Sequence, residues 1–174
     1  MRSAAAVDAG VRTFLKAAGA TLSIVALAVG LGTATAGAEE VTRAGYREAA
    51  EPICRANTEA NERILAGVRG EVRQGQLDSA ARRFSRASRA LRGTVAELKA
   101  IPRPLDDQAR LSRWLGFVSA EAELLKKTSR YLAAGKKGAA AGMVVRLKGV
   151  ASRANNAVFA FEFDYCKFDP ARFT

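Results

Sequence analysis

The densest group of residues with a chemistry of its own is a run of arginines. Eleven consecutive residues without a single acid contain five of them: Arg82, Arg83, Arg86, Arg89 and Arg92. In a helix, Arg82, Arg86 and Arg89 share one face, and guanidinium groups arrayed in this way suit phosphate or carboxylate polymers. The sequence therefore predicts an anion-contacting surface here. The alternative interpretation is a solvated helix face with no partner.

Four asparagines are candidates for a polar interior. Asn57 interrupts an apolar stripe and Asn61 follows one turn later, while Asn155 and Asn156 lie toward the C-terminal end. Amides that face each other inside a helical bundle form hydrogen bonds and fix its register. We therefore expect these four residues to form a buried polar cluster. The alternatives are a pocket for a small polar ligand near the cysteines, and simple surface exposure.

The sequence holds two cysteines, Cys54 and Cys166, and no histidine. In an oxidising compartment an even pair of cysteines usually forms a disulfide. The lack of histidine removes most zinc sites, haem with a histidine ligand and every triad built on histidine. Carboxylates such as Glu121, Glu123 and Glu162 have no base, metal ligand or phosphate loop to work with. We therefore expect a non-enzymatic protein with no catalytic residues, no metal and no cofactor.

The segment 1–38 has the three parts of a secretory signal peptide. It begins with basic residues, continues as the uncharged run 17–38, and ends in Ala36-Gly37-Ala38, which fits the small-x-small pattern of signal peptidase. Cleavage is expected after Ala38, which leaves 39–174 as a single exported domain, secreted or associated with the cell envelope. The alternative is that 17–38 is not cleaved and tethers the chain to a membrane, because about 20 apolar residues can span a bilayer.

The domain that follows this segment is strongly basic. It carries 25 Lys+Arg and 16 Asp+Glu, a formal charge of +9, which is the +11 of the whole chain less the +2 of the first 38 residues. Such a surface favours anionic partners such as lipid headgroups or envelope polymers. Nucleic acid is disfavoured, because no aromatic residues interleave the arginines for base stacking. Nucleotide composition is the alternative cause of the charge, since arginine outnumbers lysine by 20 to 8 in the whole chain.

Apolar residues recur at alternating spacings of four and three, which is typical of amphipathic helices. The pattern predicts four helices, over 43–73, 76–100, 107–134 and 139–163. Gly75, the segment Pro102-Arg103-Pro104 and the segment 135–138 separate them, since proline and glycine end helices. Pro52 falls inside the first stretch, where it either kinks the helix or marks its true start.

Four helices with short connections are expected to run antiparallel to their neighbours. In an up-down-up-down order the start of the first helix and the end of the last lie at the same end, which brings Cys54 and Cys166 together. The sequence therefore predicts an all-α antiparallel four-helix bundle closed by one disulfide. Arg47, Glu51 and Arg55 are expected to form part of an i,i+4 ladder of ion pairs along the first helix. The aromatic segment 159–168 is expected to close the disulfide end as a hydrophobic plug.

The layout resembles that of small exported bacterial proteins predicted to be helical. The resemblance covers roughly 43–168 and rests on three features: the spacing Tyr46-x6-Ile53-Cys54-x2-Asn57, the turn at Pro102-Arg103-Pro104, and a last helix that ends in a single cysteine. It implies a helical bundle with a disulfide and implies no activity. Many such chains end in a Gly-x-x-x-Cys segment, whereas this one has Glu162-Phe163-Asp164-Tyr165 before its cysteine.

These features together predict an exported, non-enzymatic binding or structural module of the cell envelope. Its basic surface is expected to contact an anionic envelope component or lipid headgroups, and a protein is the other class of partner. The alternative function is a small-ligand carrier or sensor with a site inside the bundle, near the asparagines.

Overall fold

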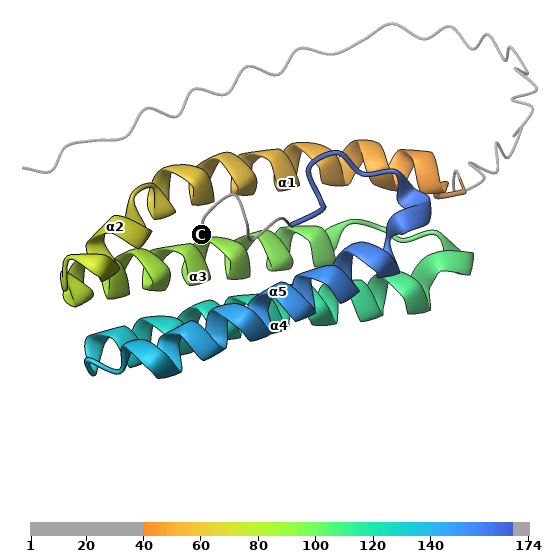
Figure 1. The fold of residues 1–174 in the computed structure, drawn as a ribbon. Helices are drawn as coiled ribbons and strands as arrows, with labels where there is room; N and C mark the ends of the chain where they lie inside the picture. Colours follow the sequence, from red (N-terminus) through yellow and green to blue (C-terminus); the bar gives the residue numbers. More distant parts are fainter. Residues whose placement is uncertain (1–39, 169–174) are drawn as a thin grey trace, which may run out of the picture. The chain divides into compact units, whose positions relative to one another are not determined.

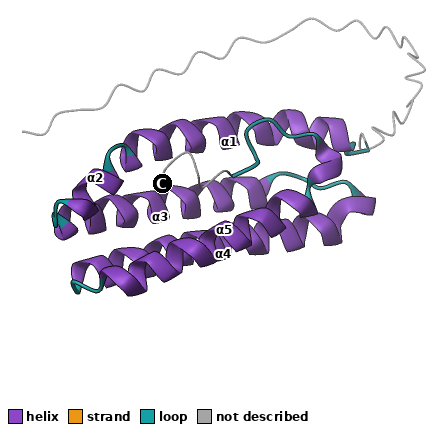
Figure 2. Ribbon diagram, viewed as in Figure 1, coloured by secondary structure: helices purple, strands orange, loops and turns teal. Residues whose placement is uncertain are grey.

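The structure, a computed structural model, describes residues 40–168, which form helices and loops without any strand (Figures 1 and 2). The elements follow in the order α1 (Arg43–Leu65), α2 (Val68–Arg73), α3 (Leu77–Ala100), η1 (Leu105–Asp107), α4 (Gln108–Ala133), α5 (Lys137–Ala157) and η2 (Phe159–Phe161). The predicted all-helical class is thus confirmed for this part of the chain. None of these helices has the length and apolarity that a membrane span requires. The predicted signal peptide, its cleavage after Ala38 and the alternative anchor lie outside the described residues.

The first predicted helix, 43–73, is divided into two. Helix α1 ends at Leu65 and α2 begins at Val68, and Gly67 between them has a φ of 76°. Glycine adopts this left-handed conformation without the steric penalty of a side chain, so it supplies the turn. Pro52 lies exposed inside α1, which begins well before it and continues beyond it. The apolar spacing runs on through Val68, which is why the pattern alone did not reveal the break.

The fourth predicted helix, 139–163, is shorter than expected at its C-terminal end. Helix α5 ends at Ala157, and Glu162 adopts a left-handed conformation with a φ of 54°. From there the chain turns back over α1, as the blue segment in Figure 1 shows. We call residues 158–168 the C-terminal strap.

Helix α1 holds the C-terminal strap by one covalent and several polar contacts. The sulfur atoms of Cys54 and Cys166 lie 2.02 Å apart in a disulfide, as predicted. The Glu51 carboxylate accepts hydrogen bonds from two strap amides, that of Asp164 at 2.5 Å and that of Tyr165 at 3.0 Å. The Arg55 guanidinium lies 4.4 Å from the centre of the Tyr165 ring. The predicted ladder along α1 is therefore wrong, because Glu51 and Arg55 contact the strap and not each other.

The core is formed where α3 packs against α1 and α4, and where α4 packs against α5. Its fully buried side chains include Leu98, Leu111, Leu115, Leu125, Leu132 and Val158. A row of aromatic rings crosses it, from Tyr46 to Phe161 (6.0 Å between centres), Phe163 (5.4 Å) and Trp114 (5.5 Å). The predicted plug is thus confirmed at Phe161 and Phe163, whereas Phe159 is 77% exposed.

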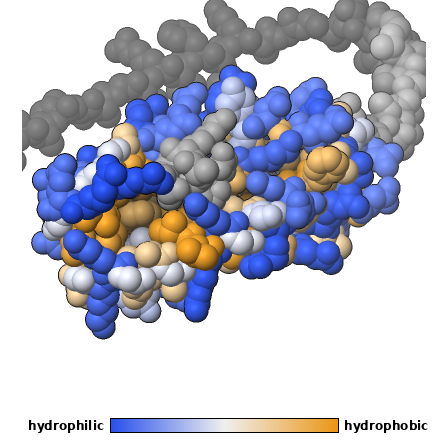
Figure 3. Space-filling view, in the orientation of Figure 1, coloured by the Kyte–Doolittle hydropathy of each residue, from blue (hydrophilic) through white to orange (hydrophobic). Residues whose placement is uncertain are grey.

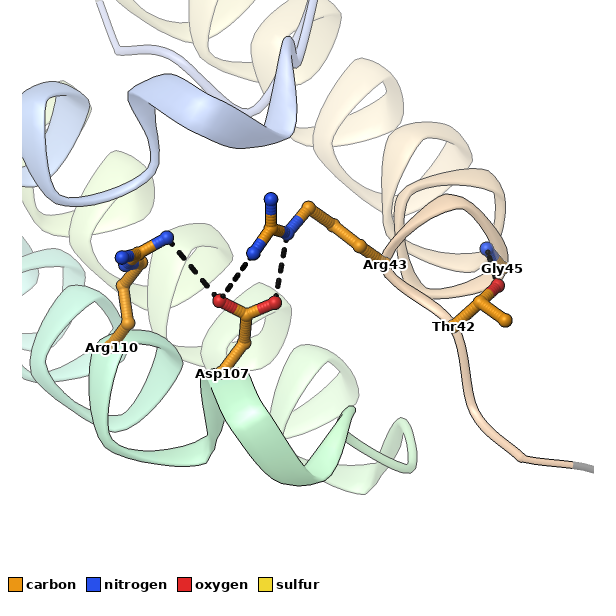
Figure 4. A network of polar contacts seen from close by, with 5 residues as sticks. All are labelled: Thr42, Arg43, Gly45, Asp107 and Arg110. Carbon is orange, nitrogen blue, oxygen red and sulfur yellow. Dashed lines mark hydrogen bonds and ion pairs between the residues drawn. The ribbon is translucent and has the colours of Figure 1, made fainter.

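A buried carboxylate joins the first turns of α1 and α4 (Figure 4). Asp107 is 3% exposed and accepts hydrogen bonds from Arg43 Nε at 2.8 Å and Nη2 at 3.0 Å, and from Arg110 Nη1 at 3.3 Å. The hydrogen bond and the charge of Asp107 together raise the pKa of Arg43 above its ordinary value. At the same place Thr42 caps α1 by accepting a hydrogen bond from the Gly45 amide at 3.0 Å.

The disulfide is expected to contribute strongly to stability, because it joins residues 112 positions apart. Replacing both cysteines (Cys54→Ala with Cys166→Ala) should lower the free energy of unfolding by about 4 kcal/mol, since the cross-link restricts the unfolded chain. Urea unfolding of the variant and of the oxidised protein measures the difference. The reduced parent protein is the control, and it should unfold at the same urea concentration as the variant. Equal midpoints for the oxidised protein and the variant would contradict this account.

Candidate functional site

A small cavity lies inside the domain, beside the disulfide, where α1, α3, α4, α5 and the C-terminal strap meet. We call it the interior cavity. Its polar lining residues are Asn57, Thr58, Thr94, Trp114, Glu121 and Asn155. The space open to the centre of a water molecule is about 30 Å³. Since roughly 10–15 Å³ of such space accommodates one water, the cavity has room for one or two water-sized groups.

Glu121, on α4, has the most unusual environment of these residues. Its side chain is fully buried, and neither carboxylate oxygen has a hydrogen-bond partner among residues 40–168. Burial raises its pKa from 4.5 to about 8, because removal from water disfavours the charged form. The indole Nε1 of Trp114 is also buried without an acceptor in the same part of the chain. Unsatisfied polar groups of this kind are rare inside folded proteins and call for an explanation.

The structure brings only some of the predicted asparagines together. Asn61 is buried and donates a hydrogen bond from Nδ2 to Asn57 Oδ1 at 2.9 Å. Asn155 instead exchanges two hydrogen bonds with the backbone of Phe168 in the strap, both at 3.0 Å. Asn156 is exposed, so its predicted place in a buried cluster is wrong. The reason is the helical rotation of about 100° per residue, which turns it away from the face that Asn155 occupies.

The sequence contained a signal for the burial of Glu121 that the predictions missed. Trp114, Glu121 and Thr128 are spaced seven residues apart along α4, and all three are buried. Residues at this spacing lie on the same side of a helix. A carboxylate midway between two buried residues of one face is therefore a candidate for burial itself.

The arginines of α3 have two different roles. Arg83 is half-buried: its Nε donates to Glu71 Oε1 at 2.7 Å and its Nη1 to the Ile64 carbonyl at 3.0 Å. Its guanidinium thus links α3 to α1 and α2. Because these hydrogen bonds already occupy it, its predicted role as an anion contact is not supported. The remaining four are exposed: Arg82, Arg86, Arg89 and Arg92.

These four exposed arginines also differ in what surrounds them. Arg89 donates to the Ser85 hydroxyl, and Arg92 lies 3.5 Å from a Glu123 carboxylate oxygen. Arg82 and Arg86 form no ion pair with any residue in the described range. The predicted anion-contacting surface is therefore open to a partner at Arg82, Arg86 and Arg89, while Arg92 is partly neutralised.

An apolar groove with a volume of about 190 Å³ is lined by residues of α2, α3, α4 and α5. Figure 1 shows α2 and the turn between α4 and α5 at the same end of these helices. The apolar lining of the groove comprises Val68, Val72, Phe84, Leu132, Ala140, Ala141 and Val144. Three exposed cations, Arg69, Arg73 and Lys137, border it, and none forms an ion pair within 40–168. Figure 3 shows apolar surface at this end of the domain between hydrophilic side chains. We call this feature the basic groove.

The basic groove was not predicted from the sequence. It requires α2 to turn away from α1 at Gly67, so that Val68 and Val72 line the same groove as residues of α4 and α5. A single continuous helix over 43–73 would not place them there.

Comparison with known proteins identifies no relative of this chain. No protein-family model matches the chain, and no curated protein or solved structure is significantly similar to it. The resemblance inferred from the cysteine and proline pattern therefore stays a prediction.

The environment of Glu121 predicts a specific pH dependence. Its pKa is 4.5 in an unfolded chain and about 8 in the folded one. The stability it contributes is therefore full below pH 4.5, decreases as the pH rises, and is lost above pH 8. Glutamine cannot ionise, so Glu121→Gln should gain stability relative to the parent between pH 5 and pH 8.5, by a few kcal/mol.

Urea unfolding of both proteins at the two pH values, in buffer of low salt, checks this. The other titrating groups cancel in the difference between the two proteins, because only position 121 is changed. A difference in unfolding free energy that stays the same at pH 5 and pH 8.5 would show that Glu121 is ionised in the folded protein throughout.

Proposed function

We propose that this protein is a non-enzymatic, extracytoplasmic binding module that docks on an anionic membrane surface of the cell envelope through the basic groove. The observation that carries the proposal is the combination of an apolar groove with three exposed cations on its border that form no ion pair within 40–168: Arg69, Arg73 and Lys137. Hydrocarbon and negative charge are the two chemistries that an anionic lipid presents together.

The apolar lining supports an acyl chain as the occupant. Transfer of apolar surface from water into such a groove is favourable by about 25 cal/mol per Å². The volume of about 190 Å³ is below the roughly 300–1,000 Å³ of pockets that enclose a drug-sized ligand. The groove therefore suits part of one acyl chain at a bilayer surface, and not a whole lipid withdrawn from it.

The charges support an anionic headgroup. Each lysine or arginine near an anionic bilayer contributes about 1 kcal/mol to binding, and the effect fades within about 10 Å in ordinary salt. Arg82 and Arg86 on α3 add exposed positive charge, and the net charge of +9 over 39–174 attracts the domain to such a surface.

We also infer that α1, α3, α4 and α5 alternate in direction, up-down-up-down. Short connections support this: residues 101–107 join α3 to α4, and residues 134–136 join α4 to α5. Helices joined in this way also pack against each other. The disulfide between an early residue of α1 and the strap after α5 agrees with the same order.

A small-ligand carrier or sensor is the second candidate function. The interior cavity favours it, because Asn57, Asn155 and Glu121 line one small space beside the disulfide. With about 30 Å³ available, that space admits a group the size of water and not a metabolite.

Reversing the three border charges (Arg69→Glu, Arg73→Glu and Lys137→Glu together) should weaken binding to vesicles that contain phosphatidylglycerol by about 100-fold or more, because three contributions of about 1 kcal/mol are lost and three repulsions are added. Co-sedimentation at low and high salt measures it, and binding of the parent protein should weaken as salt rises. A matched control carries the same charge change at three other exposed positions, Lys99, Arg113 and Lys167.

The control variant should lose much less binding than the groove variant. A third variant, Ala141→Trp, fills the groove without changing the charge and should also weaken binding. Equal losses in the two charge variants would mean diffuse attraction without a groove site. Indifference to both lipid charge and salt would overturn the proposal, and so would capture of free fatty acid without vesicle binding.

A further inference from the structure

Helix α5 differs from the other helices in the sign of its charges. It is the one α-helix within residues 40–168 that contains no Asp or Glu, whereas α1, α2, α3 and α4 each contain at least one. Its charged residues are all cations: Lys137, Arg146, Lys148 and Arg153. Exposed helices usually gain stability from pairs of opposite charge one turn apart, and α5 can form no such pair within itself.

One face of α5 is exposed along most of the helix. It consists of residues at spacings of four, four, three and four: Lys137, Ala141, Val145, Lys148 and Ser152. Residues at these spacings lie on the same side of a helix, and all five are exposed. We call these five residues the α5 face. It extends for about 22 Å, because an α-helix rises by about 1.5 Å per residue.

Val145 places an apolar group in the middle of this face. Its side chain is 69% exposed, and only Leu105 and Phe159 are other large apolar residues exposed in the described part of the chain. Lys137 and Lys148 lie before and after it, and neither forms an ion pair within 40–168. A lysine can lay its stem along apolar surface while its ammonium group reaches a polar partner. The α5 face therefore presents an apolar group and free positive charge together.

The α5 face is continuous with the basic groove. Lys137 and Ala141 belong to both, since they also line the groove. Figure 1 shows α5 running from the groove end of the domain toward the start of the C-terminal strap. A flat partner that contacts Lys137 and Ala141 at the groove is therefore next to the rest of the α5 face as well.

We propose that the domain lies along an anionic bilayer on the α5 face, with Val145 inserted among the lipid headgroups and Lys137 and Lys148 against their phosphates. This inference rests on the function proposed above and adds the orientation of the domain on the membrane. Docking through the groove alone would let the domain stand on its end, whereas contact along α5 makes it lie flat.

The chemistry of the α5 face favours a bilayer as its partner. Helices that lie in a membrane interface bury their apolar side chains about 5–10 Å deep and carry lysine and arginine beside them. Each such cation near an anionic bilayer attracts it, and a carboxylate on the same face would be repelled. The absence of Asp and Glu from α5 removes that repulsion over the whole length of the contact.

The first test places a fluorescent probe at the centre of the α5 face. Val145→Trp is mixed with vesicles of phosphatidylglycerol and phosphatidylcholine whose acyl chains carry bromine, which quenches nearby tryptophan. Its fluorescence should fall strongly on binding. The matched control is Ala96→Trp, at an exposed position of α3 that belongs to neither the groove nor the α5 face, and it should not be quenched. The native Trp114 is 1% exposed and contributes the same signal to both variants.

The second test removes the apolar group without changing the charge. Val145→Ser should weaken binding to vesicles with phosphatidylglycerol by roughly 3- to 10-fold, because less apolar surface leaves water. Leu105→Ser is the matched control, since Leu105 is 77% exposed on η1 and lies outside the groove and the α5 face. It should bind as the parent does. Co-sedimentation measures all three proteins, and urea unfolding checks that both variants fold.

The outcomes separate this inference from the proposed function. If the parent binds vesicles but the tryptophan at position 145 is not quenched and Val145→Ser binds normally, the orientation is wrong and docking through the groove stands. If the parent binds no anionic vesicle, both are overturned. Equal losses in Val145→Ser and Leu105→Ser would also overturn the orientation. So would a dimer of the parent that Val145→Ser abolishes, since the α5 face would then be covered by a second copy.

Discussion

Helix α4 has to bury more than one of its faces, because it packs against α3 on one side and α5 on the other. Both candidate sites depend on this. Trp114 and Glu121, in the first half of the helix, line the interior cavity, while Thr128 and Leu132 in the second half line the basic groove. A helix with a single buried stripe could have kept Glu121 in water. Its position between two buried residues of the same face instead places a carboxyl group in the core, where no residue of 40–168 forms a hydrogen bond with it.

The two sites differ in the physical property that defines them. The basic groove is apolar inside and charged at its border, so the hydrophobic effect and long-range attraction act on the same ligand from different parts of the site. The interior cavity has the opposite order, with its titratable carboxyl group inside and its aromatic and aliphatic neighbours around it. Desolvation therefore strengthens any electrostatic contact in the cavity and leaves those at the groove screened by salt.

The sequence predicted features that depend on periodicity, and it missed those that depend on contacts between distant segments. The four apolar stripes, the proline-rich turn and the cysteine pair are regular or unique signals, and the helical class and the disulfide followed from them. The role of Glu51 could not be predicted in this way, because no neighbouring residue in the sequence indicates that it accepts hydrogen bonds from the amides of the C-terminal strap. In the same way, the sequence does not distinguish Arg83 from the neighbouring arginines. Only the structure shows that its guanidinium donates hydrogen bonds to Glu71 and to the Ile64 carbonyl. The groove depends on one glycine conformation, which spacing cannot reveal.

The disulfide also gives the domain a closed covalent topology. Cys54 and Cys166 are 112 positions apart, so α2 to α5, with every loop between them, lie inside one ring. A protease that cuts a single loop within that ring opens it without releasing a fragment, and the two pieces remain held side by side. A single cut in one loop therefore does not separate the helices covalently. Release of a fragment from within the ring requires either a second cut or reduction of the disulfide.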